Sequence, residues 1–203
     1  YYGWLIVGVS FVTIFLVLGT RFSFGLFYAA ILKEYSWGRA ETAAAFSIVM
    51  FVHAGFSPIT GILIDRFGPR RLFPIAGIGL TIGLFLSSRI TSIWQLYIFY
   101  GVITAIGFNL ISYAPHMSLI PRWFSTKKGL ASGLVLSGVG FGTMALAPFS
   151  EFMISTIGWR NAFFALAAII FFVIVPMTAV FQRRSPEDVG QAVECANPAP
   201  QLE

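Results

Sequence analysis

Residues 61–73 read Gly-Ile-Leu-Ile-Asp-Arg-Phe-Gly-Pro-Arg-Arg-Leu-Phe, a short charged segment in an otherwise apolar region. The segment holds one acidic and three basic residues, and a long apolar run lies on each side of it. This arrangement is typical of a turn that joins two membrane-spanning helices. The sequence therefore predicts a helical hairpin whose turn lies at a membrane surface.

The composition of the whole chain also predicts a membrane protein. Hydrophobic residues make up 57% of the chain, charged residues make up 10%, and the mean hydropathy is +0.83. Soluble domains carry about 25% charged residues, so we expect lipid to cover much of this chain. The net charge of +5 comes from short basic clusters between apolar runs, which argues against a nucleic acid partner.

Six stretches are long and apolar enough to cross a bilayer, which needs about 20 such residues in a helix. None of them alternates as a strand of an outer-membrane barrel does. The predicted spans are Trp4–Tyr28, Ala43–Ile64, Leu72–Ser88, Ile93–Ile120, Leu130–Phe149 and Ala162–Phe181. The predicted fold class is thus an all-α membrane protein with six transmembrane helices.

The two ends of the chain lead to two further expectations. Residues 1–182 are expected to form the six-helix bundle, and residues 183–203 to form a cytoplasmic tail or the start of a linker, because they are polar. The first residue is Tyr1 rather than Met, so we expect a fragment, a processed product or a trimmed chain.

Lysine and arginine counts predict the orientation of the bundle. Eight of these residues fall on one side of the predicted spans: Arg66, Arg70, Arg71, Arg122, Lys127, Lys128, Arg183 and Arg184. Four fall on the other side: Lys33, Arg39, Arg89 and Arg160. The first side is therefore predicted to be cytoplasmic, together with both termini.

Several segments together resemble one known family. The pattern Gly61-x-Leu-x-Asp65-Arg-x-Gly68-x-Arg-Arg71 resembles the loop between the second and third helices of major facilitator superfamily transporters. Within that family, four further segments are similar to the monocarboxylate transporter and oxalate/formate antiporter branch. They lie at residues 121–133, 138–148, 158–163 and 184–190, and the start Tyr2-Gly3-Trp4 is similar as well.

The resemblance implies an architecture of twelve helices in two six-helix halves. This chain is similar to the N-terminal half, which is a 3+3 inverted repeat. The resemblance further implies that a C-terminal six-helix half is the missing partner. It favours a bacterial or archaeal inner (plasma) membrane as the location, with a eukaryotic plasma membrane as the alternative.

The turn at residues 61–73 is the predicted conformational gate. The resemblance implies that Asp65 braces the two halves, and its carboxylate is suited to accept hydrogen bonds from Arg66 or Arg70 or to face a helix N-terminus. A solvated surface charge is the alternative. Gly61 and Gly68 are expected to allow close helix approach and a tight turn. The gate residues are Gly61, Asp65, Arg66, Gly68, Arg70 and Arg71.

Arg21 is a charged residue inside the first predicted span. A charge there usually faces the bundle interior or a water-filled cavity. It is predicted to attract an anionic substrate, with Phe24 and Tyr28 near the same helix face. Snorkelling of the side chain to the outer interface is the alternative.

Two histidines and a polar stripe complete the predicted cavity. Asn109, Ser112, Tyr113 and His116 have the spacing of one helix face. The stripe is expected either to contact substrate or a proton, or to bond to another helix. His53 in the second span is suited to relay a proton or to bond to a neighbouring helix.

Glycine pairs in the fifth span are predicted to pack helices. Gly129 and Gly133, and Gly138 and Gly142, are small-xxx-small pairs that let helices touch.

The predicted function is secondary active transport of small organic anions, expected to be monocarboxylates, by proton symport or anion exchange with alternating access. A self-pairing six-helix protein or receptor without transport activity is the second hypothesis. An intramembrane enzyme of the rhomboid type is the third, but Gly55-Phe56-Ser57-Pro58 lacks the final glycine of the expected motif. We predict no catalytic residue, no cofactor and no metal, since two histidines and one cysteine are too few for a metal cluster.

Overall fold

The computed structural model describes residues 2–124 and 126–183, and all the regular structure in these ranges is helical. The elements are α1 (Tyr2–Phe22), α2 (Phe24–Tyr35), α3 (Arg39–Phe67), α4 (Pro69–Ser87), α5 (Ile93–Leu96), the π-helix η1 (Tyr97–Thr104), α6 (Ala105–Leu110), α7 (Tyr113–Leu119), the 3-10 helix η2 (Ile120–Arg122) and α8 (Lys128–Phe181). Five stretches of this part of the chain are long and apolar enough to cross a membrane: Tyr2–Tyr35, Arg39–Phe67, Pro69–Ser87, Ile93–Arg122 and Lys128–Phe181. The all-helical membrane fold is therefore confirmed, while several predicted boundaries change.

The first stretch runs past its predicted end at Tyr28. A local irregularity at Ser23 separates α1 from α2, but the Ser23 amide still donates to the carbonyl of Gly19 at 3.1 Å. The helix ends at Ser36, whose φ of 53° is left-handed. Lys33 and Glu34, which lie beyond the predicted end of the span at Tyr28, are therefore on the last turn of α2.

The fourth stretch is a broken helix rather than the continuous one predicted for Ile93–Ile120. Its middle is the π-helix η1, in which the Thr104 hydroxyl donates to the carbonyl of Phe99, five residues earlier, at 2.8 Å. The chain then leaves helical geometry between α6 and α7, where Ser112 is extended with ψ of −179°. Side chains before and after this break do not share one helix face.

The last stretch, α8, bends back on itself. A straight helix of 54 residues would measure about 80 Å, far more than the roughly 30 Å of a bilayer core. Gly158 interrupts it with φ 81° and ψ 157°, a conformation essentially limited to glycine. The gap predicted between the spans Leu130–Phe149 and Ala162–Phe181 was thus too long, because only Gly158 is non-helical within α8.

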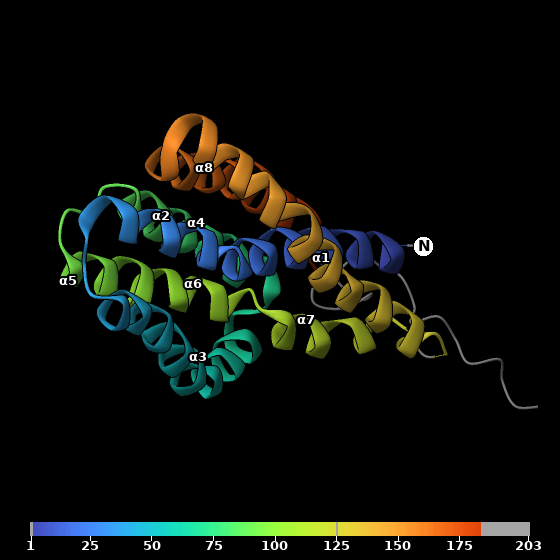
Figure 1. Cartoon of the computed structure of the whole chain (residues 1–203). Coiled ribbons are helices and arrows are strands. Elements are labelled where there is room, and N and C mark those ends of the chain that lie inside the picture. The colour runs from blue at the N-terminus through green and yellow to red at the C-terminus, as the bar shows by residue number, and fades with distance from the viewer. Residues whose placement is uncertain (1, 125, 184–203) are drawn as a thin grey trace, which may run out of the picture.

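Contacts with the first stretch show that the chain reverses at Gly158. Before it, α8 meets α1 where Gly142 lies against the backbone of Phe15. After it, the ring of Phe163 stacks on Phe27 with centroids 3.9 Å apart, and the Phe181 carbonyl accepts from the Tyr2 hydroxyl at 2.8 Å. The two arms of α8 therefore run in opposite directions, as Figure 1 shows.

Gly68 ends α3 in nearly the same conformation as Gly158, with φ 74° and ψ 162°. The following residues also match, since Gly68-Pro-Arg-Arg-Leu-Phe73 and Gly158-Trp-Arg-Asn-Ala-Phe163 share glycine, arginine and phenylalanine at equal spacing. Phe73 and Phe163 are both fully buried. The same turn thus anchors two helical hairpins through a buried aromatic ring.

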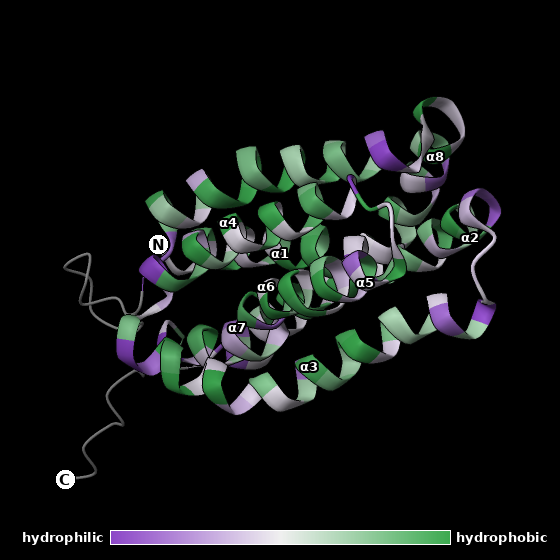
Figure 2. Cartoon of the chain, turned by 90° about the vertical axis from the view of Figure 1, so that its left-hand side faces the viewer, coloured by the Kyte–Doolittle hydropathy of each residue, from purple (hydrophilic) through white to green (hydrophobic). Residues whose placement is uncertain are grey.

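The helices lie roughly side by side, with α3 and α8 on opposite flanks and α1, α4 and α6 between them (Figures 1 and 2). α1 is the most buried of the long helices and α3 the least. The flanks expose large apolar side chains such as Phe51, Met144 and Phe172. In Figure 2 hydrophobic residues cover the lengths of the helices, and hydrophilic residues gather mainly toward the two ends, as expected of a bundle surrounded by lipid.

Candidate functional site

Arg21 lies inside the bundle near the end of α1, with only 6% of the residue exposed. Its Nη1 is 3.4 Å from Nδ1 of His53, and its Nη2 donates to the sulfur of Met50 at 3.3 Å. Within residues 2–124 and 126–183 no carboxylate forms an ion pair with Arg21, and its Nε has no hydrogen-bond partner. In this conformation the side chain turns toward α3 rather than snorkelling to the interface.

Phe24 and Tyr28 also face α3, but each in its own environment. Phe24 is buried and stacks on Tyr100 with centroids 4.2 Å apart. The Tyr28 hydroxyl donates to the carbonyl of Arg39, at the start of α3, at 3.1 Å. Phe24 thus belongs to the packed core around Arg21, and Tyr28 joins two helices at the end of the bundle.

Asn109 connects α6 to α3 beside the Arg21 cluster. It is 2% exposed, its Nδ2 donates to the His53 carbonyl at 2.7 Å, and the Thr60 hydroxyl donates to its Oδ1. Pro58, which lacks an N–H donor, lies between these two contact points on α3. Arg21, His53, Asn109 and Thr60 therefore form a continuous polar chain across α1, α3 and α6.

Tyr113 and His116 do not extend this chain. They follow the break at Ser112, so the single polar face predicted from helical spacing does not form. Tyr113 is 48% exposed, whereas His116 is fully buried and its ring lies 4.6 Å from that of Phe73. Nδ1 of His116 donates to the Ser112 carbonyl at 3.0 Å, and its Nε2 has no partner.

A cavity of about 160 Å³ lies between α3 and the α6–α7 segment. Its lining includes Asn109 and Thr60 from the polar chain and Asp65 from the predicted gate. Ser57, Ser112 and Ser118 add further hydroxyl groups. The cavity thus connects the buried polar groups to the end of the bundle where α3 ends.

The gate residues are arranged differently from the expectation. Asp65 pairs with Arg122 of η2, with Oδ1 and Nη2 3.5 Å apart, instead of with Arg66 or Arg70. Both partners of this pair are solvent-exposed. Gly68 makes the predicted tight turn, and an added Cβ at Gly61 would meet no atom within 4 Å, so no helix of the described chain approaches there.

The glycine pairs of α8 divide into two groups. Gly138 and Gly142 pack closely against α1, since an added Cβ at Gly138 would lie 2.9 Å from the Phe11 carbonyl oxygen. Gly129 and Gly133 have open space around them, so the packing predicted for that pair is not found within the described chain. The two pairs differ in whether they pack against α1, and the spacing of the glycines in the sequence does not reveal this difference.

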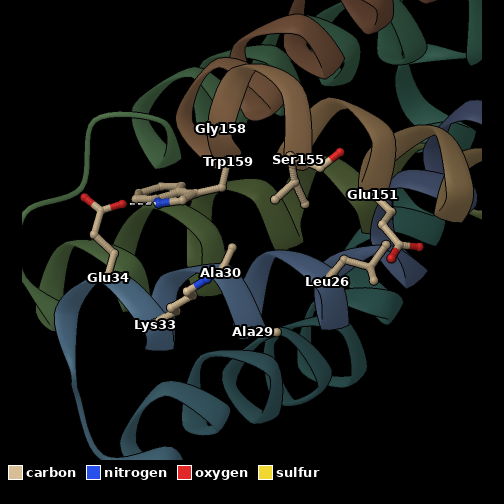
Figure 3. Close-up of a pocket in the computed structure, with 10 residues that line it drawn as sticks. Leu26, Ala29, Ala30, Lys33, Glu34, Glu151, Ser155, Gly158 and Trp159 are labelled. Carbon is tan, nitrogen blue, oxygen red and sulfur yellow. Dashed lines mark hydrogen bonds between the residues drawn. The ribbon is translucent and has the colours of Figure 1, made fainter.

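A cavity of about 700 Å³ lies between α2 and α8 at the opposite end of the bundle. Figure 3 shows Lys33, Glu34 and Glu151 around it, with Trp159 beside Glu34. Trp159 Nε1 donates to Glu34 Oε2 at 2.5 Å, and Arg160 forms an ion pair with the same carboxylate. Sequence reasoning did not find this cluster, because Glu34 and Trp159 are distant in the chain. The described residues hold no group of three potential metal ligands from His, Cys, Asp and Glu.

Comparison with known proteins identifies the family. The family model of the Major Facilitator Superfamily matches residues 10–200, and the chain belongs to this family. Within it, the chain is similar to monocarboxylate transporters, as the sequence motifs predicted. It is 32% identical over 168 residues to "Monocarboxylate transporter 13" of Bos taurus, covering 83% of this chain and 39% of the relative.

Two other relatives bear related names. "Monocarboxylate transporter 14" of Mus musculus is 29% identical over 197 residues, covering 97% of this chain and 38% of the relative. "Monocarboxylate transporter 2" of Homo sapiens is 29% identical over 171 residues, covering 83% of this chain and 35% of the relative. The names describe transporters rather than enzymes, and the chain spans less than two fifths of the length of each of these relatives.

Proposed function

We propose that this chain forms the N-terminal six-helix half of a secondary transporter that carries small monocarboxylates. The observation that supports this most strongly is Arg21, a buried cation without an ion-pair partner among the described residues. A charged side chain inside a membrane protein is costly and usually serves a substrate or ion pathway. The similarity to monocarboxylate transporters favours a carboxylate as the anion that pairs with it.

The neighbours of Arg21 fit this role. A guanidinium binds a carboxylate through two parallel hydrogen bonds, and its charge would then be neutralised by the substrate. His53 touches Arg21, and an imidazole can accept or release a proton. In our proposal, arrival of the anion beside Arg21 favours protonation of His53, which would couple the proton to the acid; exchange of one anion for another is the alternative.

Alternating access requires a second bundle against which this one moves. The reversal at Gly158 and the matching turn at Gly68 support six transmembrane segments arranged as a 3+3 repeat. The exposed apolar residues of α3 and α8 offer surfaces for lipid and for the C-terminal half. The end that holds Arg66, Arg70 and Arg122 is assigned to the cytoplasm, with both termini.

The test is uptake of labelled lactate, formate and oxalate into vesicles that contain the full-length gene product. Arg21→Met removes the charge at similar length, and Arg21→Lys retains it. We expect Arg21→Met to lower uptake about tenfold or more, equivalent to about 1.4 kcal/mol of lost interaction, and Arg21→Lys to retain part of the activity. Equal uptake by wild type and Arg21→Met would contradict the proposal, and a stable self-pairing product without uptake would favour the second hypothesis.

A further inference from the structure

A basic pocket of about 360 Å³ lies where α3 ends, α4 begins and α8 ends. Four arginines line it, together with Phe67 and the Gly68–Pro69 turn: Arg66, Arg70, Arg71 and Arg183. Arg66 belongs to α3, Arg70 and Arg71 belong to α4, and Arg183 follows the end of α8. Tertiary structure thus brings Arg183 to the other three across more than one hundred residues of sequence.

The positive charge of this basic pocket is not neutralised within the described part of the chain. Residues 2–124 and 126–183 contain two ion pairs, Asp65 with Arg122 and Glu34 with Arg160, and neither includes a lining arginine of the pocket. Asp65 lines the cavity between α3 and α6–α7 instead. Four cations that line one small volume repel each other, so an anion there would be favoured.

An apolar groove of about 490 Å³ adjoins the basic pocket and shares Phe67 and Arg71 with it. The rest of its lining is aliphatic and consists of Leu63, Leu72, Ile75 and Leu110. Ile75 is 64% exposed on α4, one helix of a bundle that lies in lipid. A polar basic site at a helix end thus continues directly into an apolar groove that runs along the membrane-spanning part.

We propose that these two adjoining features bind one anionic phospholipid, with its phosphate in the basic pocket and one acyl chain in the apolar groove. The guanidinium group of arginine can donate two parallel hydrogen bonds to the oxygens of a phosphate. Basic pockets between transmembrane helices at a membrane surface bind anionic lipid headgroups. The aliphatic lining explains why the ligand is a lipid rather than a soluble phosphate. This site is separate from Arg21 and does not depend on the transport proposal.

The experiment measures which lipids the purified full-length protein retains. The protein is reconstituted in vesicles of phosphatidylcholine and phosphatidylglycerol at nine to one, extracted with mild detergent, and its bound lipids are counted by native mass spectrometry. We expect the ratio of bound phosphatidylglycerol to bound phosphatidylcholine to be about tenfold higher than in the vesicle, which corresponds to about 1.4 kcal/mol. The Arg70→Gln/Arg71→Gln variant is expected to lose this enrichment.

The matched control is Lys127→Gln/Lys128→Gln, which removes the same charge from exposed residues outside the pocket. It should keep the enrichment. Equal loss in both variants, or retention in both, would overturn the proposal. A second arm adds 1 mM glycerol 3-phosphate, a headgroup without acyl chains; displacement of phosphatidylglycerol by this compound would overturn the lipid assignment in favour of a soluble phosphate.

Discussion

The side-chain amide of Asn109 donates a 2.7 Å hydrogen bond to the main-chain carbonyl of His53 and so fastens α6 to the middle of α3. The same amide accepts from Thr60, on the other side of Pro58. A single buried side chain thus holds two points of a helix that contains proline. His53, the neighbour of Arg21, is positioned by this contact.

Replacement of Asn109 with leucine should destabilise the bundle. The change leaves the Thr60 hydroxyl with its local acceptor only and removes both bonds between α6 and α3. Loss of such contacts costs about 1–3 kcal/mol in soluble proteins and nearer 0.6–2 kcal/mol in membranes. This loss of stability can be measured by unfolding the protein in mixed micelles of dodecyl maltoside and sodium dodecyl sulfate. An unchanged midpoint would show that the contact contributes nothing to stability.

Gly142→Ala should destabilise the contact between α8 and α1. An added Cβ at Gly142 has no room beside the Phe15 backbone, and overpacking of this kind costs about 1–3 kcal/mol. Gly140→Ala is the matched control on the same helix, because a Cβ there would meet no atom within 4 Å. The control should be neutral or slightly stabilising, since alanine favours helix over glycine by about 1 kcal/mol. Similar behaviour of the two variants in thermal unfolding would contradict this packing.

Gly158→Ala should strain the reversal of α8. The conformation at φ 81° and ψ 157° costs a non-glycine residue about 1–3 kcal/mol. Gly79→Ala is a suitable control, because Gly79 is helical and open space surrounds it. The expected outcome is a lower unfolding midpoint for Gly158→Ala alone. If both variants match the wild type, the reversal does not require glycine.

Asp65→Asn should affect transport more than stability. The pair with Arg122 is exposed, and such pairs contribute about 0–1 kcal/mol. Expression and unfolding of the full-length protein should therefore change little, while uptake falls if Asp65 acts as a gate. Arg122→Gln removes the partner and tests whether this pair is the contact that matters. Normal uptake by Asp65→Asn would refute the gate role.

Much of the fold could be predicted from the sequence, because the lipid environment restricts which secondary structures a membrane-spanning segment can form. Long apolar runs must be helical, since each backbone polar group needs a partner inside the bilayer. The hairpin turn at Gly68, the membrane class and the family were predictable from residues 61–73 and a few similar segments. For Arg21 the sequence left two possibilities, a side chain that faces the bundle interior and one that snorkels to the interface.

Other features depended on contacts between distant residues. Helical spacing placed Asn109, Tyr113 and His116 on one face, but the break at Ser112 separates them. Pro115 was a local signal of this break, because proline has no N–H to continue the helix, and the spacing argument did not use it. The pairing of Asp65 with Arg122 and of Glu34 with Arg160 also joins residues far apart in the chain. Sequence periodicity describes one helix at a time, so it cannot specify which helix lies opposite.

The sequence by itself determined that this protein is an all-helical membrane protein with a glycine turn between two spans, because hydropathy and glycine geometry act over short distances. Tertiary structure alone decided that Gly142 packs on α1 while Gly133 does not, and that Arg183 completes a pocket with Arg66, Arg70 and Arg71. These outcomes depend on how the helices are placed against each other, which is set by the packing of the whole bundle.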